Sequence, residues 1–297
     1  MLLEPVSNRL MKKISLIIIL IFLGTLPVLL RDGSRREPSL LAKPRYISLA
    51  PATTEILFAL GLHHQIIGDT TFCDYPQAAK QIPKVGSFSE PNIEKILSLK
   101  PDIIFTTGLE QAPVVLRLEK LGLKVIVSDP KNIPELFESI IQIGKATGRE
   151  QEARLLVEGM RARIDIIKFM VEKIREDKRP KVFIEIWHDP IMTAGPGSIV
   201  DEILTLAGGK NIAYDVPRAY SRFSTEAIIE RNPDVIILGY MNKDNTKDAV
   251  LNRLGWQNIK AVRNKRVVSD INPNLIFRPG PRIVNGIEEI YRHLYNE

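Results

Sequence analysis

The chain is poor in the side chains that form disulfides and hold metals. Its 297 residues include one cysteine, Cys73, and four histidines. A single cysteine cannot form an intrachain disulfide, although this leaves the compartment open. It also supplies too few ligands for an iron–sulfur or similar cluster. The histidines are not combined with carboxylates at ligand spacing, so we expect no zinc or manganese site. His63-His64 is interpreted as a solvated turn, and a ligand contact for His188 stays open.

The chain also lacks the patterns of catalysis and of nucleic-acid binding. No nucleophile, base and orienting group form a set, so no catalytic residue is assigned. Residues 195–198 read Gly-Pro-Gly-Ser and open an expected helix, but the lysine of a phosphate-binding loop is missing. The formal net charge is +6, yet no basic stripe alternates with aromatic residues. We therefore expect neither an enzyme nor a nucleic-acid partner.

A hydrophobic segment stands near the N-terminus. Lys12-Lys13 precedes an apolar run from Ile14 to Leu30, the pattern of a secretory signal. The run is long for a signal and short for a membrane-spanning helix, so an uncleaved anchor stays open. No cysteine follows it, which removes a lipoprotein anchor. Residues 1–44 are assigned as signal peptide or anchor plus spacer, with a start at Met1 or Met11, and the protein is expected in the periplasm or on the outer face of the cytoplasmic membrane.

One unit occurs twice in the remaining sequence. Residues 94–105 read EKILSLKPDIIF and residues 226–237 read EAIIERNPDVII, and they align without a gap. Proline ends a helix and disfavours helical backbone in the residue before it. The short apolar run that follows is typical of a buried parallel strand. Two further pairs of segments repeat in the same order, namely 54–61 with 201–208 and 124–129 with 265–270.

This duplication predicts the fold class, an α/β protein of two Rossmann-like lobes with parallel sheets joined by one long α-helix. Apolar residues recur at steps of three and four between residues 149 and 177, which indicates a connecting helix of about 40 Å. We expect an N-terminal lobe at 45–148, a linker helix at 149–179 and a C-terminal lobe at 180–297. Residues 188–198 are expected to form a loop.

Several motifs over residues 45–297 resemble a known family. They are SLAPATTE at 48–55, NIEKI at 92–96, Pro101-Asp102, TAGPGS at 193–198, GGKNI at 208–212 and PGPR at 279–282. The chain resembles the periplasmic binding proteins of cobalamin and iron-siderophore ATP-binding cassette (ABC) importers, whose lobes are joined by one helix. The resemblance implies a solute-binding protein that captures a small molecule between its lobes and delivers it to a membrane permease.

The resemblance assigns a docking role to the two repeated glutamates. In this family one glutamate on each lobe docks onto arginines of the permease, and the matching positions are Glu94 and Glu226. A glutamate near a helix start is also stabilised by the helix dipole whatever its partner. The equivalent positions in both copies favour docking, because two separate carboxylates can bind two guanidinium groups and fix an orientation.

The resemblance also implies residues that contact the ligand. Tyr75 and Phe88 fall on first-lobe loops that carry aromatic residues in the family, and Arg278 matches an arginine of the cleft. Less securely aligned second-lobe positions are Trp187, Tyr220 and Arg222. Flat rings pack well against a rigid macrocycle, and arginine bonds its amide or carboxylate rim. Two alternatives stay open: Trp187 belongs to the core, or Tyr75-Pro76 only forms a turn.

The expected protein is therefore a monomeric solute-binding protein with no catalysis and no resident cofactor. The expected ligand is a bulky metal chelate, a corrinoid first and a ferric siderophore or haem next. The expected partner is an ABC permease dimer, with membrane contact only through that permease and the N-terminal segment. Two alternatives are a membrane-anchored surface sensor or interaction module, and a two-lobed enzyme of the nitrogenase type, which would need cysteine ligands to a cluster.

Overall fold

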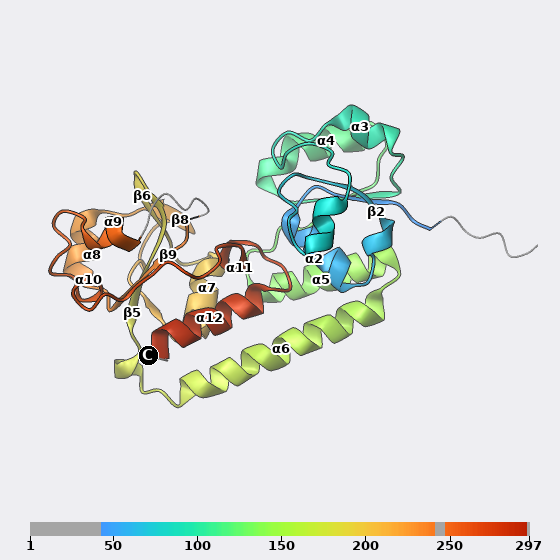
Figure 1. Ribbon diagram of the computed structural model, residues 1–297. Helices are drawn as coiled ribbons and strands as arrows, with labels where there is room; N and C mark the ends of the chain where they lie inside the picture. The colour runs from blue at the N-terminus through green and yellow to red at the C-terminus, as the bar shows by residue number, and fades with distance from the viewer. Residues whose placement is uncertain (1–42, 241–246, 296–297) are drawn as a thin grey trace, which may run out of the picture. The chain divides into compact units, whose positions relative to one another are not determined.

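The structure is a computed structural model that describes residues 43–240 and 247–295 (Figure 1). The hydrophobic segment at 14–30 lies outside the described residues. Within the described ranges, no helix has both the length and the hydropathy that crossing a membrane requires. Residues Pro44–Glu297 form one compact unit.

Strands and helices alternate along most of this unit. The strands are β1 (Tyr46–Ser48), β2 (Ile66–Asp69), β3 (Ile103–Thr106), β4 (Val125–Val127), β5 (Lys181–His188), β6 (Ile191–Ala194), β7 (Lys210–Asn211), β8 (Tyr220–Arg222), β9 (Val235–Leu238) and β10 (Val267–Val268). The α-helices are α2 (Pro51–Ala59), α3 (Ile93–Ser98), α4 (Ala112–Lys120), α5 (Ile133–Thr147), α6 (Glu150–Glu172), α7 (Ile199–Leu206), α8 (Thr225–Arg231), α9 (Lys247–Leu251), α10 (Lys260–Arg263), α11 (Asn274–Phe277) and α12 (Ile283–Tyr295). Short 3-10 turns lie at His63–Gln65, Gln77–Gln81, Leu109–Gln111 and Glu176–Lys178.

The first half of the chain, from β1 to α5, builds a parallel sheet in the order β2-β1-β3-β4. Tyr46 lies opposite Ile103, and Ile104 lies opposite Val125. Every residue of β3 is buried, which explains the apolar run Ile103-Ile104-Phe105, because a parallel strand covered on both faces has no polar side.

The second half, from β5 to α12, repeats this order. Its parallel strands follow one another as β7-β5-β9-β10, so each strand of the first sheet has an equivalent. The prediction of two duplicated Rossmann-like halves is confirmed. The loop expected at 188–198 is wrong in part, because β6 lies within it. β6 pairs antiparallel with both β5 and β8, so the second sheet is mixed.

The repeated helix–Pro-Asp–strand unit has the same geometry in both copies. α3 and α8 are each followed by a residue with left-handed backbone, Lys100 at φ 46° and Asn232 at φ 49°. The next aspartate then ties two strands together. Asp102 accepts a hydrogen bond from the backbone N–H of Arg45 at 2.7 Å, and Asp234 accepts one from that of Lys181 at 2.9 Å. The Pro-Asp pair therefore both ends a helix and aligns the central strands of each sheet.

Helix α6 connects the two halves and packs against both. Its buried face is formed by Ala153, Val157, Met160, Ile164, Ile167 and Val171. This face contacts α5 of the first half and both α7 and α12 of the second, and it belongs to a core cluster that includes residues of both sheets. The helix has 23 residues, about 35 Å at 1.5 Å per residue, so it is one to two turns shorter than the sequence predicted. The lobe boundaries at 148/149 and 179/180 stay predictions.

Candidate functional site

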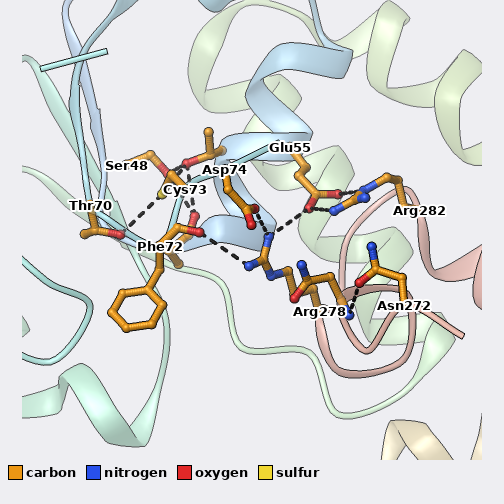
Figure 2. A network of polar contacts seen from close by, with 12 residues as sticks. Ser48, Glu55, Thr70, Phe72, Cys73, Asp74, Asn272, Arg278 and Arg282 are labelled. Atoms are coloured by element: carbon orange, nitrogen blue, oxygen red, sulfur yellow. Dashed lines mark hydrogen bonds and ion pairs between the residues drawn. The ribbon is translucent and has the colours of Figure 1, made fainter. Parts of the chain in front are cut away.

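Three of the predicted ligand contacts gather around the loop between β2 and α3. This loop carries both Tyr75 and Phe88, and the ring of Phe88 packs edge-on against Phe72 at 6.5 Å between centroids. Arg278 follows α11, 204 residues after Asp74, yet its Nη1 donates to the Asp74 Oδ1 at 2.5 Å (Figure 2). The fold therefore brings the predicted arginine from the second half to the predicted aromatic loop of the first.

A buried glutamate, which the sequence analysis did not assign to the site, adds a second arginine to these contacts. Glu55 in α2 is 4% exposed and accepts two hydrogen bonds from Arg282, at 2.6 and 2.8 Å (Figure 2). The guanidinium of Arg282 also stacks over the ring of Tyr75 at 3.6 Å, and that of Arg278 lies 3.7 Å from Glu55. Two arginines, two carboxylates and one tyrosine thus form a single network.

The charges in this network reinforce one another. Burial alone would raise the pKa of Asp74, but the hydrogen bond and charge of Arg278 outweigh it and lower the pKa below its ordinary value. Burial alone would lower the pKa of Arg282, and the hydrogen bond and charge of Glu55 raise it instead. Arg278 is therefore already bound to protein carboxylates, and a ligand would meet a fixed guanidinium rather than a mobile one.

The base of the aromatic loop is held by a hydrogen bond between a lysine and a buried aspartate. Asp69, at the end of β2, is fully buried, and its Oδ1 accepts a hydrogen bond from the Lys84 Nζ at 2.7 Å. The second oxygen, Oδ2, has no hydrogen-bond partner among the described residues. Burial raises the pKa of Asp69 to about 7, although Lys84 opposes the shift. Cys73 is buried nearby as a free thiol hydrogen-bonded to Thr54, as expected for a structural cysteine.

The three second-half predictions share one face of the mixed sheet. Trp187 on β5 lies opposite Met192 on β6, which in turn lies opposite Arg222 on β8. Tyr220 is two residues from Arg222 on the same strand and points to the same side. Trp187 is 47% exposed, so the alternative that placed it in the core is wrong.

A surface hollow of about 500 Å³ lies along β6 and β8, lined by Met192, Pro217, Arg218, Tyr220, Ser221 and Arg222. This volume is within the range of small-molecule sites. Burial raises the pKa of Tyr220, and the charge of Glu110 raises it further. Among the described residues, no hydrogen bond or ring contact joins Trp187, Tyr220 or Arg222 directly to Tyr75, Phe88 or Arg278.

Below the exposed Trp187, a second buried network stabilises β5. Glu185 is fully buried and accepts hydrogen bonds from both terminal nitrogens of Arg253, each at 2.7 Å, and from the hydroxyl of Tyr240. The ring of His188 packs between those of Trp187 and Tyr240. These contacts fix the end of β5 from which Trp187 projects.

Glu94 and Glu226 occupy the same position in their helices. Each is the second residue of a short helix, α3 or α8, and each is exposed. The helix starts are capped alike, since Asn92 accepts from the backbone N–H of Lys95 and Ser224 accepts from that of Ala227. Among the described residues, neither glutamate forms an ion pair. The two carboxylates are therefore accessible to an external partner.

The described residues contain no group of three or more histidine, cysteine or acidic side chains arranged to hold a metal ion. The absence of a resident cofactor stays a prediction. The sequence missed Glu55, Asp74 and Arg282. One signal was present, because Glu55 and Arg282 each lie inside a motif on which the family resemblance rests. Their mutual contact, 227 residues apart, required the fold.

The duplicated sheets, the single connecting helix and the aromatic and arginine groups define a two-part α/β binding protein. Residues 47–272 match the family model described as periplasmic binding protein, and the chain belongs to that family. An uncharacterized ABC transporter substrate-binding lipoprotein, YvrC of Bacillus subtilis, is 36% identical over 91% of this chain and 86% of its own length.

The names of two further relatives mention a ligand. The vitamin B12-binding protein of Vibrio cholerae is 29% identical over 86% of this chain and 92% of its own length. The crystal structure of a possible iron-binding periplasmic protein from Staphylococcus epidermidis superposes with a TM-score of 0.75 at 32% identity, covering 85% of this chain and 98% of that one.

Family membership confirms several predictions. The protein is a substrate-binding component of an ABC transporter and works in the periplasm or on the outer face of the cytoplasmic membrane. Its class of partner is a membrane permease, and its class of ligand is a small molecule. The relatives are binding proteins rather than enzymes.

Proposed function

We propose that this protein captures a bulky metal chelate and delivers it to an ABC importer, with a corrinoid as the first candidate and a ferric siderophore or haem next. The observation that carries the proposal is the meeting of Tyr75, Phe88 and Arg278. The family resemblance predicts all three as ligand contacts, and Arg278 from the second half bonds to Asp74 on the first-half loop that carries Tyr75 and Phe88.

The aromatic and arginine side chains at the predicted ligand contacts suit a flat, rigid ligand with polar edges. Exposed rings such as Tyr75 and Trp187 offer apolar area at little entropic cost because they have few rotatable bonds. Arg278 is oriented by Asp74 and can offer its remaining N–H groups to a carbonyl or carboxylate. The relatives described as binding vitamin B12 and as possibly binding iron support this ligand class.

A second ligand-facing surface is proposed on the sheet face that carries Trp187, Tyr220 and Arg222. The guanidinium groups of Arg218 and Arg222, both exposed, form no ion pair among the described residues. All of their N–H groups are available to the rim of a ligand, whereas Arg278 can offer only those that are not already bound to Asp74 and Phe72. We place the ligand between this surface and the Tyr75 group.

For delivery, we propose that Glu94 and Glu226 dock the protein onto the permease. Both carboxylates are exposed at equivalent helix starts, and neither is paired within the described residues. Arginines are the expected complement on the permease, because a guanidinium binds a carboxylate through two parallel hydrogen bonds.

The test is a ligand panel measured by isothermal titration calorimetry. Cyanocobalamin, cobinamide, haem and ferric siderophores are titrated into the purified protein, and one of them is expected to bind with a Kd of about 1 μM or tighter. Tyr75→Ala and Phe88→Ala should weaken that binding. The matched control is Phe169→Ala, which removes an exposed ring on α6. Absence of binding by every member of the panel would refute the ligand class.

A further inference from the structure

The duplicated chain contains a second pair of equivalent glutamates, Glu55 and Glu202. The repeated segments at 54–61 and 201–208 align these two residues. In the structure both lie four residues before the end of equivalent helices, α2 and α7, each of which leads to an edge strand, β2 or β7, of the parallel part of its sheet. Unlike Glu94 and Glu226, both side chains are shielded from solvent: Glu55 is buried and Glu202 is half-buried.

Each of these glutamates bonds to the opposite half of the chain. Glu55 of the first half accepts two hydrogen bonds from Arg282, the residue directly before α12 of the second half. Glu202 of the second half accepts a hydrogen bond at 2.8 Å from the backbone N–H of Ile133, the first residue of α5 in the first half. In one contact the glutamate comes from the first half and its donor from the second, and in the other contact these origins are reversed.

The helices that receive these contacts are themselves equivalent. α5 follows the last strand of the first sheet, and α12 follows the last strand of the second sheet after the short helix α11. Both helices pack on α6. The contacts thus form a pseudo-two-fold pair, in which a glutamate from the first α-helix of each half bonds to the start of the last helix of the other half.

We propose that Glu55 and Glu202 form a pair of clasps that hold the two halves together and position Tyr75 and Arg278 for the ligand. Desolvation offsets much of the attraction within a buried ion pair, so we assign the Glu55–Arg282 contact to the arrangement of the halves rather than to net stability. The Glu55 contact reaches the site directly, since Arg282 stacks on Tyr75 and Arg278 lies beside Glu55. Glu55 is therefore a positioning residue.

The two clasps differ in chemistry, and this difference gives a specific expectation. Glu202 accepts from a neutral backbone N–H, so Glu202→Gln keeps an acceptor oxygen and should behave like the wild type. Glu55 faces two guanidinium groups, and Glu55→Gln would remove their counter-charge and place an NH2 donor against other donors. Glu202→Gln should therefore keep its contact and Glu55→Gln should lose it, whereas alanine should remove the contact at either position.

The distance between the halves can be measured by double electron–electron resonance in the full chain. Cys73 is replaced by serine, and spin labels are placed at two exposed positions, Leu116 in α4 and Leu254 in the second half. We expect a single narrow distance distribution in this background, a broader one for Glu55→Ala and for Glu202→Ala, and the broadest for the double variant. Glu158→Gln, at an exposed carboxylate on α6, is the matched control and should leave the distribution unchanged.

The positioning role rests on the proposed function and is tested separately. If opening the clasps leaves the competent arrangement about one-tenth populated, the apparent affinity for the chelate found in the panel should fall about tenfold. Unchanged distance distributions in both alanine variants would overturn the clasps, whether or not any ligand binds. Broadened distributions with unchanged affinity would overturn the positioning role alone. If no member of the panel binds, the proposed function is refuted, and the distance measurements alone decide whether the two glutamate contacts hold the halves together. If Glu55→Ala does not fold, Glu55→Gln, which is also expected to disrupt the contact with Arg282, decides the same questions.

Discussion

The buried carboxyl of Asp69 should make the stability of this protein fall as pH rises from 5 to 8. Asp69 anchors the loop that carries Tyr75 and Phe88. Its side chain is fully buried with one oxygen paired to Lys84 and the other without a partner among the described residues. This environment favours the neutral acid, so the pKa is raised from 3.8 to about 7.

The direction and the size of this change in unfolding free energy follow from the linkage between protonation and folding. Between pH 3.8 and 7 the folded state holds a proton on Asp69 that the unfolded state has released, so folding is favoured at the lower pH. The stabilisation is complete below pH 3.8 and is lost as pH rises through 7. Each unit of pKa difference corresponds to about 1.4 kcal/mol, so the loss between pH 5 and 8 is about 2.6 kcal/mol.

The measurement compares wild type with Asp69→Asn by urea unfolding at pH 5, 6, 7 and 8. Asparagine has the same shape and cannot ionise, and Lys84 keeps its hydrogen bonds to the carbonyls of Cys73 and Ala79. All other titrating groups are common to both proteins, so the difference in unfolding free energy isolates Asp69. We expect the wild type to lose stability relative to the variant as pH rises. A difference that stays constant, or that changes in favour of the wild type, would refute the reasoning.

Two further predictions concern the repeated unit. Charge reversal of both Glu94 and Glu226 to lysine should abolish association with the cognate permease in a pull-down while leaving ligand affinity unchanged; the matched control reverses two neighbouring exposed carboxylates, Glu90 and Glu230. Loss of ligand binding instead would place the first pair in the ligand site. Asp102→Ala and Asp234→Ala should each lower the unfolding free energy by about 1 kcal/mol, with the larger loss at the less exposed Asp234, because a backbone N–H loses its charged acceptor. Asparagine at either position should restore most of the loss, and equal effects of alanine and asparagine in urea unfolding would contradict the hydrogen-bond explanation.

The sequence predicted the parts of the fold that depend on local pattern. Helix α5 is an example of an element with local signals at both ends, since a proline stands at its second position and a glycine follows its last residue. The duplicated Pro-Asp units predicted a buried strand in each half, and the structure confirms both, β3 and β9. Their pairing with β1 and β5 is a result of the structure alone. β6 was missed because its four residues lie between Pro190 and Gly195 and are too few to show a period.

For the candidate site too, some residues could be predicted from the sequence and others could not. Tyr75, Phe88 and Arg278 were implied by the family resemblance, and the repetition of residues 54–61 in 201–208 was visible in the sequence itself. Which residues those echoed glutamates bind was decided only by the tertiary structure, because Glu55 meets Arg282 across 227 residues and Glu202 meets Ile133 across 69. Sequence periodicity reports which face of an element is buried. The partner that a buried charge requires is set by how distant elements pack, and that information exists only once the chain has folded.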